Sequence, residues 1–307
     1  MMKSSLTLIP AGLLCLIFFQ NCNRSKQTAE GDDTYTSGTA KFIADESFAP
    51  ILDEEVYVFK AANPAANPQM EYRPENNAVN YLLADSARFA FLSRKLNADE
   101  IKTLQVHNLS PVQSQFASDG IAIIVNEASA DTTTSVGEIK KMLIGQAKTD
   151  RSIVFDNPNS SLVRYLKELA GSTELKQKNI YALKSNKEVI NYVSQHPDAI
   201  GITSYSWLMD PDTDYADAVK KIKVVGVKDE NSKTPDQYYK PSQTTLYLKQ
   251  YPLTRNLYMV NCTGKKGLGT GFELFIAGDK GQRIVLRSGL LPMVIPGRDI
   301  TVHNNKL

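Results

Sequence analysis

Three short segments of the chain combine hydroxyl, backbone amide and guanidinium groups, which together can bind a small oxyanion without a metal. They are Asp45–Phe48, Ser93–Arg94, and Asn157–Ser161 followed by Arg164 one helical turn later. Backbone N–H groups at a helix N-terminus point toward a bound anion, serine hydroxyls add donors, and arginine adds a two-pronged donor. The predicted oxyanion-binding residues are Asp45, Ser47, Phe48, Ser93, Arg94, Asn157, Ser160, Ser161 and Arg164.

Each of these segments also has a purely structural interpretation. Ser47 and Ser160 could cap helices, because serine is common at helix starts. Arg94 and Arg164 could be solvated surface charges. The binding interpretation is favoured because all three segments follow predicted strands, and open α/β sheets bind ligands at the carboxyl ends of their strands.

Composition and the remaining motifs argue against several other kinds of chemistry. The formal charge of the 307-residue chain is +2, so there is no electrostatic case for binding nucleic acid. Three cysteines and three widely separated histidines predict no metal, no cofactor and no catalytic triad. The acidic run from Asp210 to Asp217 lacks the glycine and terminal glutamate of a calcium-binding loop and is predicted to be a solvated turn.

Two further segments have structural interpretations. The glycine-rich run Gly264–Gly271 lacks the Gly-Lys-Ser/Thr ending of a nucleotide-binding loop, so we predict a flexible loop. Cys262 ends an apolar run and is predicted to be a buried, small hydrophobic residue rather than a reactive thiol.

The N-terminus has the pattern of a targeting segment. Lys3 precedes an apolar run, Leu6–Phe19, that is too short for the ~20 residues of a membrane span but fits the core of a secretory signal. Cys22 resembles the lipidated first residue of a bacterial lipoprotein, although Asn21 stands where such motifs usually carry a small residue. We predict a signal peptide at 1–22, lipidation at Cys22 and a tether at 23–37. The alternatives are an ordinary cleaved signal and an uncleaved anchor.

After the tether, the hydrophobic pattern alternates between strand and helix. The predicted strands are 40–44, 88–92, 120–126, 152–155, 200–203, 222–227, 245–249 and 257–261, and the predicted helices are 48–62, 78–83, 136–144, 161–169 and 186–195, with 273–277 and 282–287 in one or two closing helices. This alternation predicts an α/β protein with mostly parallel sheets. The chain is large for one doubly wound sheet, so we predict two α/β lobes.

Six segments, taken in order, resemble the phosphate-binding subunits of bacterial ABC importers, which are two-lobed periplasmic binding proteins. The segments are DSARFAFLSRKL (Asp85–Leu96, with Glu100 following), DGIAIIVN (Asp119–Asn126), DNPNSSLVRYL (Asp156–Leu166), AIGITS (Ala199–Ser204), YKPSQTTLYLKQYPLTRNLYMV (Tyr239–Val260) and GFELFIAGDKGQRIVLRSGLLP (Gly271–Pro292). The resemblance covers residues 39–292. It implies a type II periplasmic binding protein-like fold, with two crossover strands joining lobe 1 (38–122 plus 254–307) to lobe 2 (123–253).

The same resemblance implies a function. The chain is expected to be a non-enzymatic, lipid-anchored and monomeric solute-binding protein in the cell envelope, facing the periplasm or the exterior. It would capture phosphate, or a similar tetrahedral oxyanion, between its lobes and deliver it to an ABC permease. Two alternatives stay open: a structural or sensory lipoprotein without a transport role, and a phosphate-ester hydrolase with Asp45 or Glu46 as base.

The chain departs from the family's pattern at two positions of the expected site. Arg94 stands where the relatives carry Asp, and Ser161-Leu162 replace a Gly-Thr pair. Phosphate keeps a proton near neutral pH that a carboxylate can accept, whereas sulfate has none. Selectivity would then come from Asp45, Glu46 or Glu75, unless these carboxylates pair with Arg94 and leave the cleft indifferent between tetrahedral anions.

Overall fold

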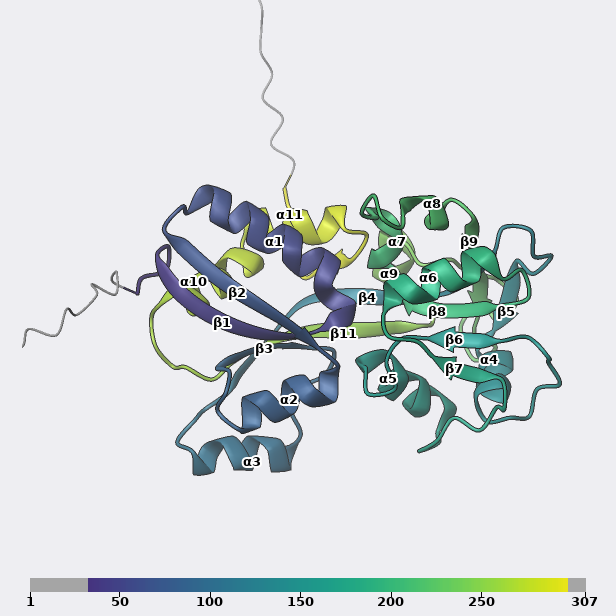
Figure 1. Cartoon of the computed structure of the whole chain (residues 1–307), viewed down its shortest axis with the longest axis horizontal. Helices are drawn as coiled ribbons and strands as arrows, with labels where there is room; N and C mark the ends of the chain where they lie inside the picture. The colour runs from purple at the N-terminus through teal and green to yellow at the C-terminus, as the bar shows by residue number, and fades with distance from the viewer. Residues whose placement is uncertain (1–32, 298–307) are drawn as a thin grey trace, which may run out of the picture.

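The computed structural model describes residues 33–297, in which one mixed β-sheet runs through both lobes (Figure 1). The strands are β1 (Gly38–Asp45), β2 (Ala66–Arg73), β3 (Phe89–Leu92), β4 (Val112–Asn126), β5 (Thr133–Ser135), β6 (Ile153–Phe155), β7 (Ile180–Ala182), β8 (Ile200–Ser204), β9 (Ile222–Val224), β10 (Gly226–Lys228), β11 (Thr254–Asn261) and β12 (Leu291–Pro292). The helices are η1 (Glu46–Phe48), α1 (Ala49–Ala62), α2 (Glu75–Leu83), α3 (Ala98–Val106), α4 (Val136–Leu143), α5 (Ser161–Ala170), α6 (Asn186–Gln195), α7 (Ser206–Met209), α8 (Ala216–Val219), α9 (Gln243–Tyr247), α10 (Leu268–Ala277) and α11 (Asp279–Arg287).

The strand order is β2-β1-β3-β11-β4-β8-β6-β7, and it divides the molecule into two lobes. The first lobe contains β1, β2 and β3, which pair in parallel, and the second contains β6, β7 and β8, which also pair in parallel. The long strand β4 pairs antiparallel with β11 along its first half and with β8 along its second, so it belongs to both lobes. The predicted α/β class is confirmed, with antiparallel pairing where β4 and β11 join the lobes.

Alternating side chains along the strands produce a separate core on each face of the sheet. In β1, Phe42 packs under α1, α10 and α11, whereas the next residue, Ile43, packs under α2 and α3. In β4, Ile123 faces α4 and α5, and Ile124 faces α6 and α8. Helices therefore cover both faces of the sheet in each lobe, and the carboxyl ends of β1, β3 and β6 are directed toward the junction between the lobes (Figure 1).

Most predicted elements are confirmed, and three predictions are wrong. Residues 245–249 are not a strand, because the Ser242 hydroxyl caps a helix there, α9. Residues 222–227 form two strands, β9 and β10, which pair with different partners. The predicted flexible loop at 264–271 ends at Gly267, where α10 begins. Gly269 and Gly271 serve close packing in that helix, because a Cβ at either position would clash with Phe89 or with the backbone of Tyr35.

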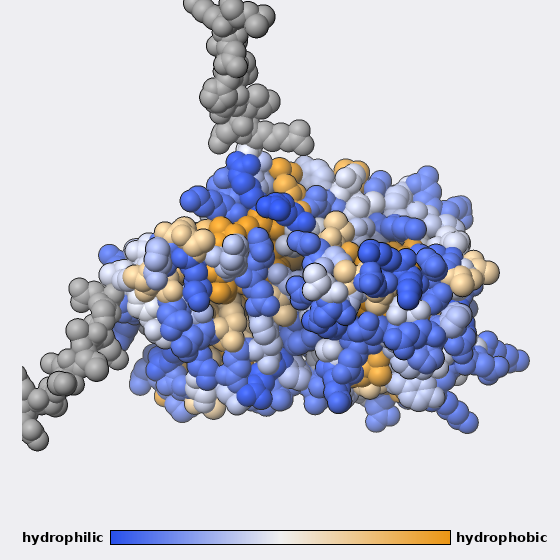
Figure 2. All heavy atoms as spheres, turned by 45° about the horizontal axis from the view of Figure 1, so that its top comes forward, coloured by the Kyte–Doolittle hydropathy of each residue, from blue (hydrophilic) through white to orange (hydrophobic). Residues whose placement is uncertain are grey.

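The predicted signal peptide, Cys22 and most of the predicted tether lie outside the described residues. The end of that tether is held against the first lobe, since the Asp33 carboxylate accepts a hydrogen bond of 2.7 Å from the backbone N–H of Leu268. Within residues 33–297, no helix has the length and apolar character needed to cross a bilayer. Figure 2 shows a mainly hydrophilic surface with hydrophobic side chains gathered near the end of the described chain, where Met293, Val294 and Ile295 are exposed.

Cys262 and Glu55 are buried titratable groups of the first lobe, and the pKa of each is raised. Cys262 is buried, as predicted, and burial raises the pKa of its thiol to about 11. Glu55, on α1, is fully buried beside Ile51, Leu52 and Phe59, and neither of its carboxylate oxygens has a hydrogen-bond partner. Burial, with a smaller contribution from the charge of Glu54, raises the pKa of Glu55 to about 9.

Replacing Glu55 by methionine is expected to stabilise the protein. The folded protein holds the Glu55 proton up to about pH 9, but the unfolded chain releases it above the ordinary glutamate pKa of 4.5. Rising pH therefore favours unfolding between these two values. At pH 7 the cost is about 3 kcal/mol by this linkage. Urea unfolding should therefore show that Glu55→Met raises the free energy of unfolding by about 2–3 kcal/mol at pH 7.5, with a smaller gain at pH 4.5.

Glu54→Gln is the matched control, because Glu54 is the exposed neighbour on the same helix. It should change the free energy of unfolding by less than about 0.5 kcal/mol at either pH. An equal effect of Glu55→Met at pH 4.5 and 7.5 would show that Glu55 is already ionised in the folded protein.

Candidate functional site

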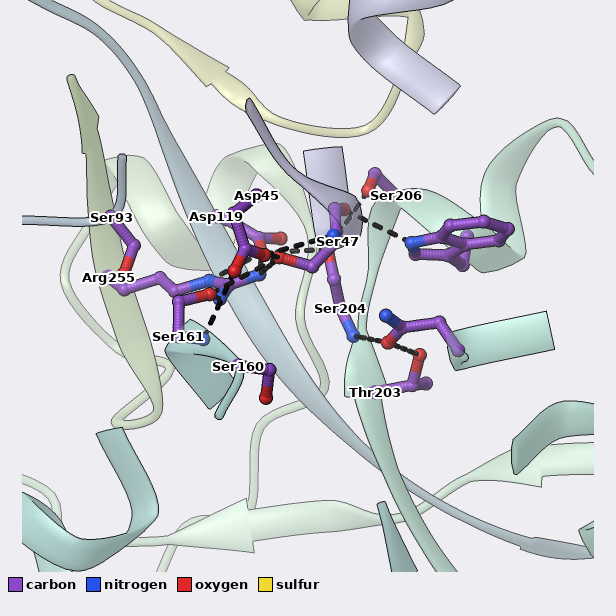
Figure 3. A network of polar contacts seen from close by, with 12 residues as sticks. Asp45, Ser47, Ser93, Asp119, Ser160, Ser161, Thr203, Ser204, Ser206 and Arg255 are labelled. Atoms are coloured by element: carbon purple, nitrogen blue, oxygen red, sulfur yellow. Dashed lines mark hydrogen bonds and ion pairs between the residues drawn. The ribbon is translucent and has the colours of Figure 1, made fainter. Parts of the chain in front are cut away.

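The ends of strands from both lobes bring polar residues together at the lobe junction (Figure 3). Asp45 ends β1, Ser47 lies in η1 directly after it, and Ser93 follows β3, all in the first lobe. Ser160 and Ser161 begin α5 in the second lobe, after β6. These five residues are all buried. The structure thus gathers side chains from the three segments that the sequence analysis singled out.

The Asp45 carboxylate lies at the centre of this arrangement and accepts hydrogen bonds from both lobes. Its Oδ1 accepts the backbone N–H of Ser47 at 3.0 Å and also the Ser47 hydroxyl. Its Oδ2 accepts the backbone N–H of Ser161, at the N-terminus of α5, at 3.2 Å. Asp45 is fully buried, and burial together with the charge of Glu75 raises the pKa of its carboxyl. One carboxylate therefore occupies the donors that we expected an oxyanion to use.

Arg255, on β11, supplies the buried guanidinium of this site, and the sequence analysis did not identify it. Its guanidinium donates to the Ser161 hydroxyl at 2.6 Å and to the Ser47 hydroxyl at 3.1 Å. The guanidinium carbon lies 5.2 Å from the centroid of the Phe48 ring. Arg255 is only 5% exposed, so its charge acts with little solvent screening. The feature of the sequence that could have identified Arg255 is its position as a lone arginine among the apolar residues of Leu253–Val260. This stretch lies within one of the six segments that carry the family resemblance.

Asp119, on β4, holds Arg255 in place and was also missed. Its Oδ2 accepts two bonds from Arg255, at 2.9 and 3.1 Å, and one from the Ser204 hydroxyl at 2.7 Å. Its Oδ1 is buried and has no hydrogen-bond partner. Burial raises the pKa of Asp119, and the charge of Arg255 opposes that shift. An unpartnered buried acceptor is costly, so Oδ1 is suited to accept a hydrogen bond from a bound ligand that carries a proton.

Ser93 and Arg164 form a second polar group that connects the lobes. Glu75, fully buried on α2, accepts the Ser93 backbone N–H at 2.7 Å and the Ser93 hydroxyl at 2.9 Å. Arg164, on α5 of the second lobe, donates to Glu75 at 2.7 Å and to the Ser93 hydroxyl at 2.6 Å. Arg164 is therefore not a free surface charge but an interlobe contact.

Three other predicted binding residues have structural partners. The Arg94 guanidinium makes two hydrogen bonds to Glu100, at 2.7 and 2.8 Å. Of the three carboxylates expected to pair with Arg94, Glu75 is the one that does so, at 4.0 Å from the Arg94 Nε. The Asn157 side chain accepts the backbone N–H of Asn159 within the loop. The Ser160 hydroxyl caps α5 and donates to Asp156 at 2.5 Å, which confirms the capping alternative for this residue. Their roles as ligand-binding residues stay predictions.

The site contains more carboxyl groups than guanidinium groups. Burial raises the pKa of Glu46 to about 7, and burial with the charge of Asp45 raises the pKa of Asp156 to about 8. The Asn186 side-chain amide links these two carboxyls, at 3.0 Å from Glu46 and 3.2 Å from Asp156. Carboxyls that keep their protons near neutral pH can donate hydrogen bonds to an anion instead of repelling it. Among residues 33–297, no three His, Cys, Asp or Glu side chains are grouped to hold a metal ion.

Comparisons with known proteins agree on one family. The model of a PBP superfamily domain matches residues 26–280. The chain is 23% identical over 284 residues to a phosphate-binding protein PstS of Staphylococcus saprophyticus, covering 88% of this chain and 84% of that protein. It is 26% identical over 261 residues to PstS of Staphylococcus aureus strain USA300, covering 80% and 76%. Among solved structures, it resembles a putative phosphate ABC transporter substrate-binding protein with bound phosphate from Clostridium perfringens, with a TM-score of 0.69, 18% identity, and 84% and 100% of the two chains covered.

Proposed function

The chain belongs to the PBP superfamily, and from this membership and the donors gathered around Asp45 we propose that it is a solute-binding protein that captures phosphate between its two lobes and delivers it to an ABC permease. The observation that carries the proposal is that one carboxylate, itself an oxyanion, accepts backbone N–H groups from Ser47 of the first lobe and Ser161 of the second. The predicted type II periplasmic binding protein-like fold is confirmed by its likeness to solved structures.

Phosphate would take the hydrogen bonds that Asp45 now accepts. The donors of these bonds are the two backbone N–H groups and the Ser47 hydroxyl. The Ser161 hydroxyl and the Arg255 guanidinium, which contacts both hydroxyls, would add further donors. Charge-assisted hydrogen bonds are worth ~1.5–3 kcal/mol each, so several of them support micromolar affinity after the cost of closing the lobes. Asp119 Oδ1 would accept a hydrogen bond from the hydroxyl that phosphate carries near neutral pH. This assigns to Asp119 the selectivity that the sequence analysis sought at Asp45, Glu46 or Glu75.

The remaining parts of the proposal concern domains, location and partners. Lobe 1 comprises 38–122 plus 254–307 and lobe 2 comprises 123–253, and they close about β4 and β11. Lipidation at Cys22 anchors the protein in the cell envelope, and a permease of the ABC class receives the phosphate. The hydrolase alternative is not adopted, because the similar proteins are phosphate-binding proteins.

Calorimetry on the full-length protein tests the proposed function. Titration with phosphate, arsenate and sulfate at pH 7.5 should give one phosphate per chain with a dissociation constant of about 1–10 µM, and sulfate should bind at least tenfold more weakly. The absence of heat with all three anions, at concentrations up to the millimolar range, would refute the proposal.

The Asp45 carboxylate competes with phosphate for the same donors, so Asp45→Asn should bind phosphate more tightly. Asn keeps an oxygen that can accept the Ser47 N–H but removes the charge. Because the pKa of Asp45 is raised, its carboxyl loses the proton at higher pH than an ordinary aspartate, and phosphate affinity should fall as pH rises through that pKa. Calorimetry should show about tenfold tighter binding than the wild type at pH 8.5 and a smaller difference at pH 5.5.

The control for this change is Asp99→Asn, an exposed aspartate in the first turn of α3, which should leave affinity unchanged at both pH values. If Asp45→Asn instead weakens phosphate binding tenfold, then Asp45 contributes to binding directly rather than competing with the ligand.

A further inference from the structure

A cavity lies between the lobes, and Trp207 is one of its lining residues. Its volume is about 510 Å³, and it is lined by α1 and β2 of the first lobe and by α6, α7 and the loop after α7 of the second. Helix α1 and the segment around α7 and α8 face each other across the lobe junction in Figure 1. This volume lies in the range of ~300–1,000 Å³ that is typical of small-molecule sites. We call it the junction cavity.

Four aromatic side chains are among the residues that line the junction cavity. Tyr57 and Tyr72 contribute from the first lobe, and Trp207 and Tyr215 from the second. Tyr57 is 71% exposed, so its ring is accessible to a ligand. The faces of tyrosine and tryptophan rings carry negative electrostatic potential and attract cations.

Charged groups at the junction cavity are mostly negative. Asp53, Glu54, Asp210 and Asp212 line it, and Lys187 is the one basic residue among the lining residues that the structure describes. The Lys187 ammonium is already paired with Asp214, at 2.8 Å, and lies 3.7 Å from Asp212. Burial raises the pKa of the Asp53 carboxyl, and the charge of Asp212 on the other lobe adds to that shift.

Lys187 also shows how a cation is held in this cavity. Its ammonium lies 5.1 Å from the centroid of the Tyr215 ring while it contacts the two carboxylates. An aromatic face combined with carboxylates is the arrangement that binds alkylammonium and guanidinium groups. The Lys187 ammonium contacts only one of the aromatic residues of the cavity, Tyr215. Three other aromatic residues, Tyr57, Tyr72 and Trp207, also line it.

From these walls and charges we infer that the junction cavity is a binding site for a small organic cation of the alkylammonium or guanidinium class. The lining of this cavity differs from that of the oxyanion site, and its test needs no phosphate. Trp207, which lines the cavity, also contacts the oxyanion site, because its indole N–H donates to the backbone carbonyl of Ser47 at 3.1 Å. One wall of the cavity comes from each lobe. A cation that contacts both walls therefore favours the closed arrangement of the lobes.

The fluorescence of Trp207 tests this inference directly, because Trp207 is the single tryptophan of the chain. The full-length protein is titrated with tetramethylammonium, guanidinium and 1,4-diaminobutane chlorides at constant ionic strength, with sodium chloride as the blank. At least one organic cation should give a saturable change in emission that sodium does not give. No saturable change with any of the three would overturn the inference.

Matched variants locate the site. Asp210→Asn/Asp212→Asn removes two exposed carboxylates and should weaken cation binding at least tenfold, whereas Lys187→Met removes the internal competitor and should strengthen it. Asp229→Asn, on a distant loop, is the control and should have no effect. If the double variant and the wild type bind the cation equally, the fluorescence change arises elsewhere and the inference fails. Thermal unfolding of each variant confirms that it is folded.

Discussion

Arg255→Met is expected to weaken phosphate binding at least 100-fold. The Arg255 guanidinium donates to the hydroxyls of Ser47 and Ser161. Arg255 is only 5% exposed, so a cation from the solvent cannot reach this position to replace its charge in the variant. In the proposed complex this guanidinium donates to phosphate, and the loss of two charge-assisted hydrogen bonds of ~1.5–3 kcal/mol each to the ligand corresponds to that factor or more. Calorimetry with phosphate at pH 7.5 measures the effect.

The same change leaves Asp119 buried without its cation, which destabilises the fold by about 3–5 kcal/mol. The double variant Arg255→Met/Asp119→Leu removes both charges and should recover most of this stability without recovering phosphate binding. Arg94→Met is the comparison for the guanidinium, because Arg94 is paired with Glu100, and it should change phosphate affinity by less than about threefold. Equal losses in Arg94→Met and Arg255→Met would contradict the assignment of Arg255 as the anion-binding arginine.

The second large effect is expected for Asp119→Asn, which should reduce the preference for phosphate over sulfate about 100-fold. Asp119 Oδ1 is a buried acceptor without a partner, so it stabilises a ligand that brings a proton and repels one that does not. The asparagine side chain can donate at that position, so phosphate loses an acceptor and sulfate gains a donor. The ratio of the two affinities is the measurement, because it cancels any general effect of the lost negative charge on anion binding.

Asp156→Asn provides the matched control for this selectivity. Asp156 is equally buried and lies near the same site, but both of its oxygens already have partners, in Ser160 and Asn186. Its replacement should leave the phosphate-to-sulfate ratio within about threefold of the wild type. If Asp156→Asn and Asp119→Asn lower the ratio equally, selectivity comes from the summed negative charge of the site and not from Asp119 Oδ1.

Much of the fold followed from local patterns. The helix at 186–195 was predicted to the residue, because its apolar positions Val189, Ile190 and Val193 recur at helical spacing after the capping Ser185. The segment at 245–249 was not predicted, because its short alternating pattern suits a strand equally well and only the Ser242 cap decides for a helix. The glycine content of 264–271 suggested a flexible loop. The sequence could not show that Gly269 and Gly271 pack against Phe89 and Tyr35, because these neighbours are far away in the chain.

Local signals also identified part of the oxyanion site. Asp45, Ser47 and Ser161 lie where strands end and helices begin, and such positions carry their own sequence signature of hydroxyl and carboxyl residues. Ser160 and Ser161 are adjacent and alike in sequence, but one hydroxyl caps its own helix and the other meets Arg255. The direction of each side chain, which separates a cap from a binding group, is set by the turn and cannot be read from residue type.

The chain's own residue order determined the α/β class, the family and the loops at which an anion could bind, because periodicity, caps and strand ends are properties of neighbouring residues. The tertiary structure alone decided which charges meet. Arg255 and Asp119 are 136 positions apart and lie within strands, where no local motif marks them, and they pair because the register of β11 against β4 places them opposite each other. The long-range pairing of strands, and not any local preference, is therefore what turns three separate loops into one buried site.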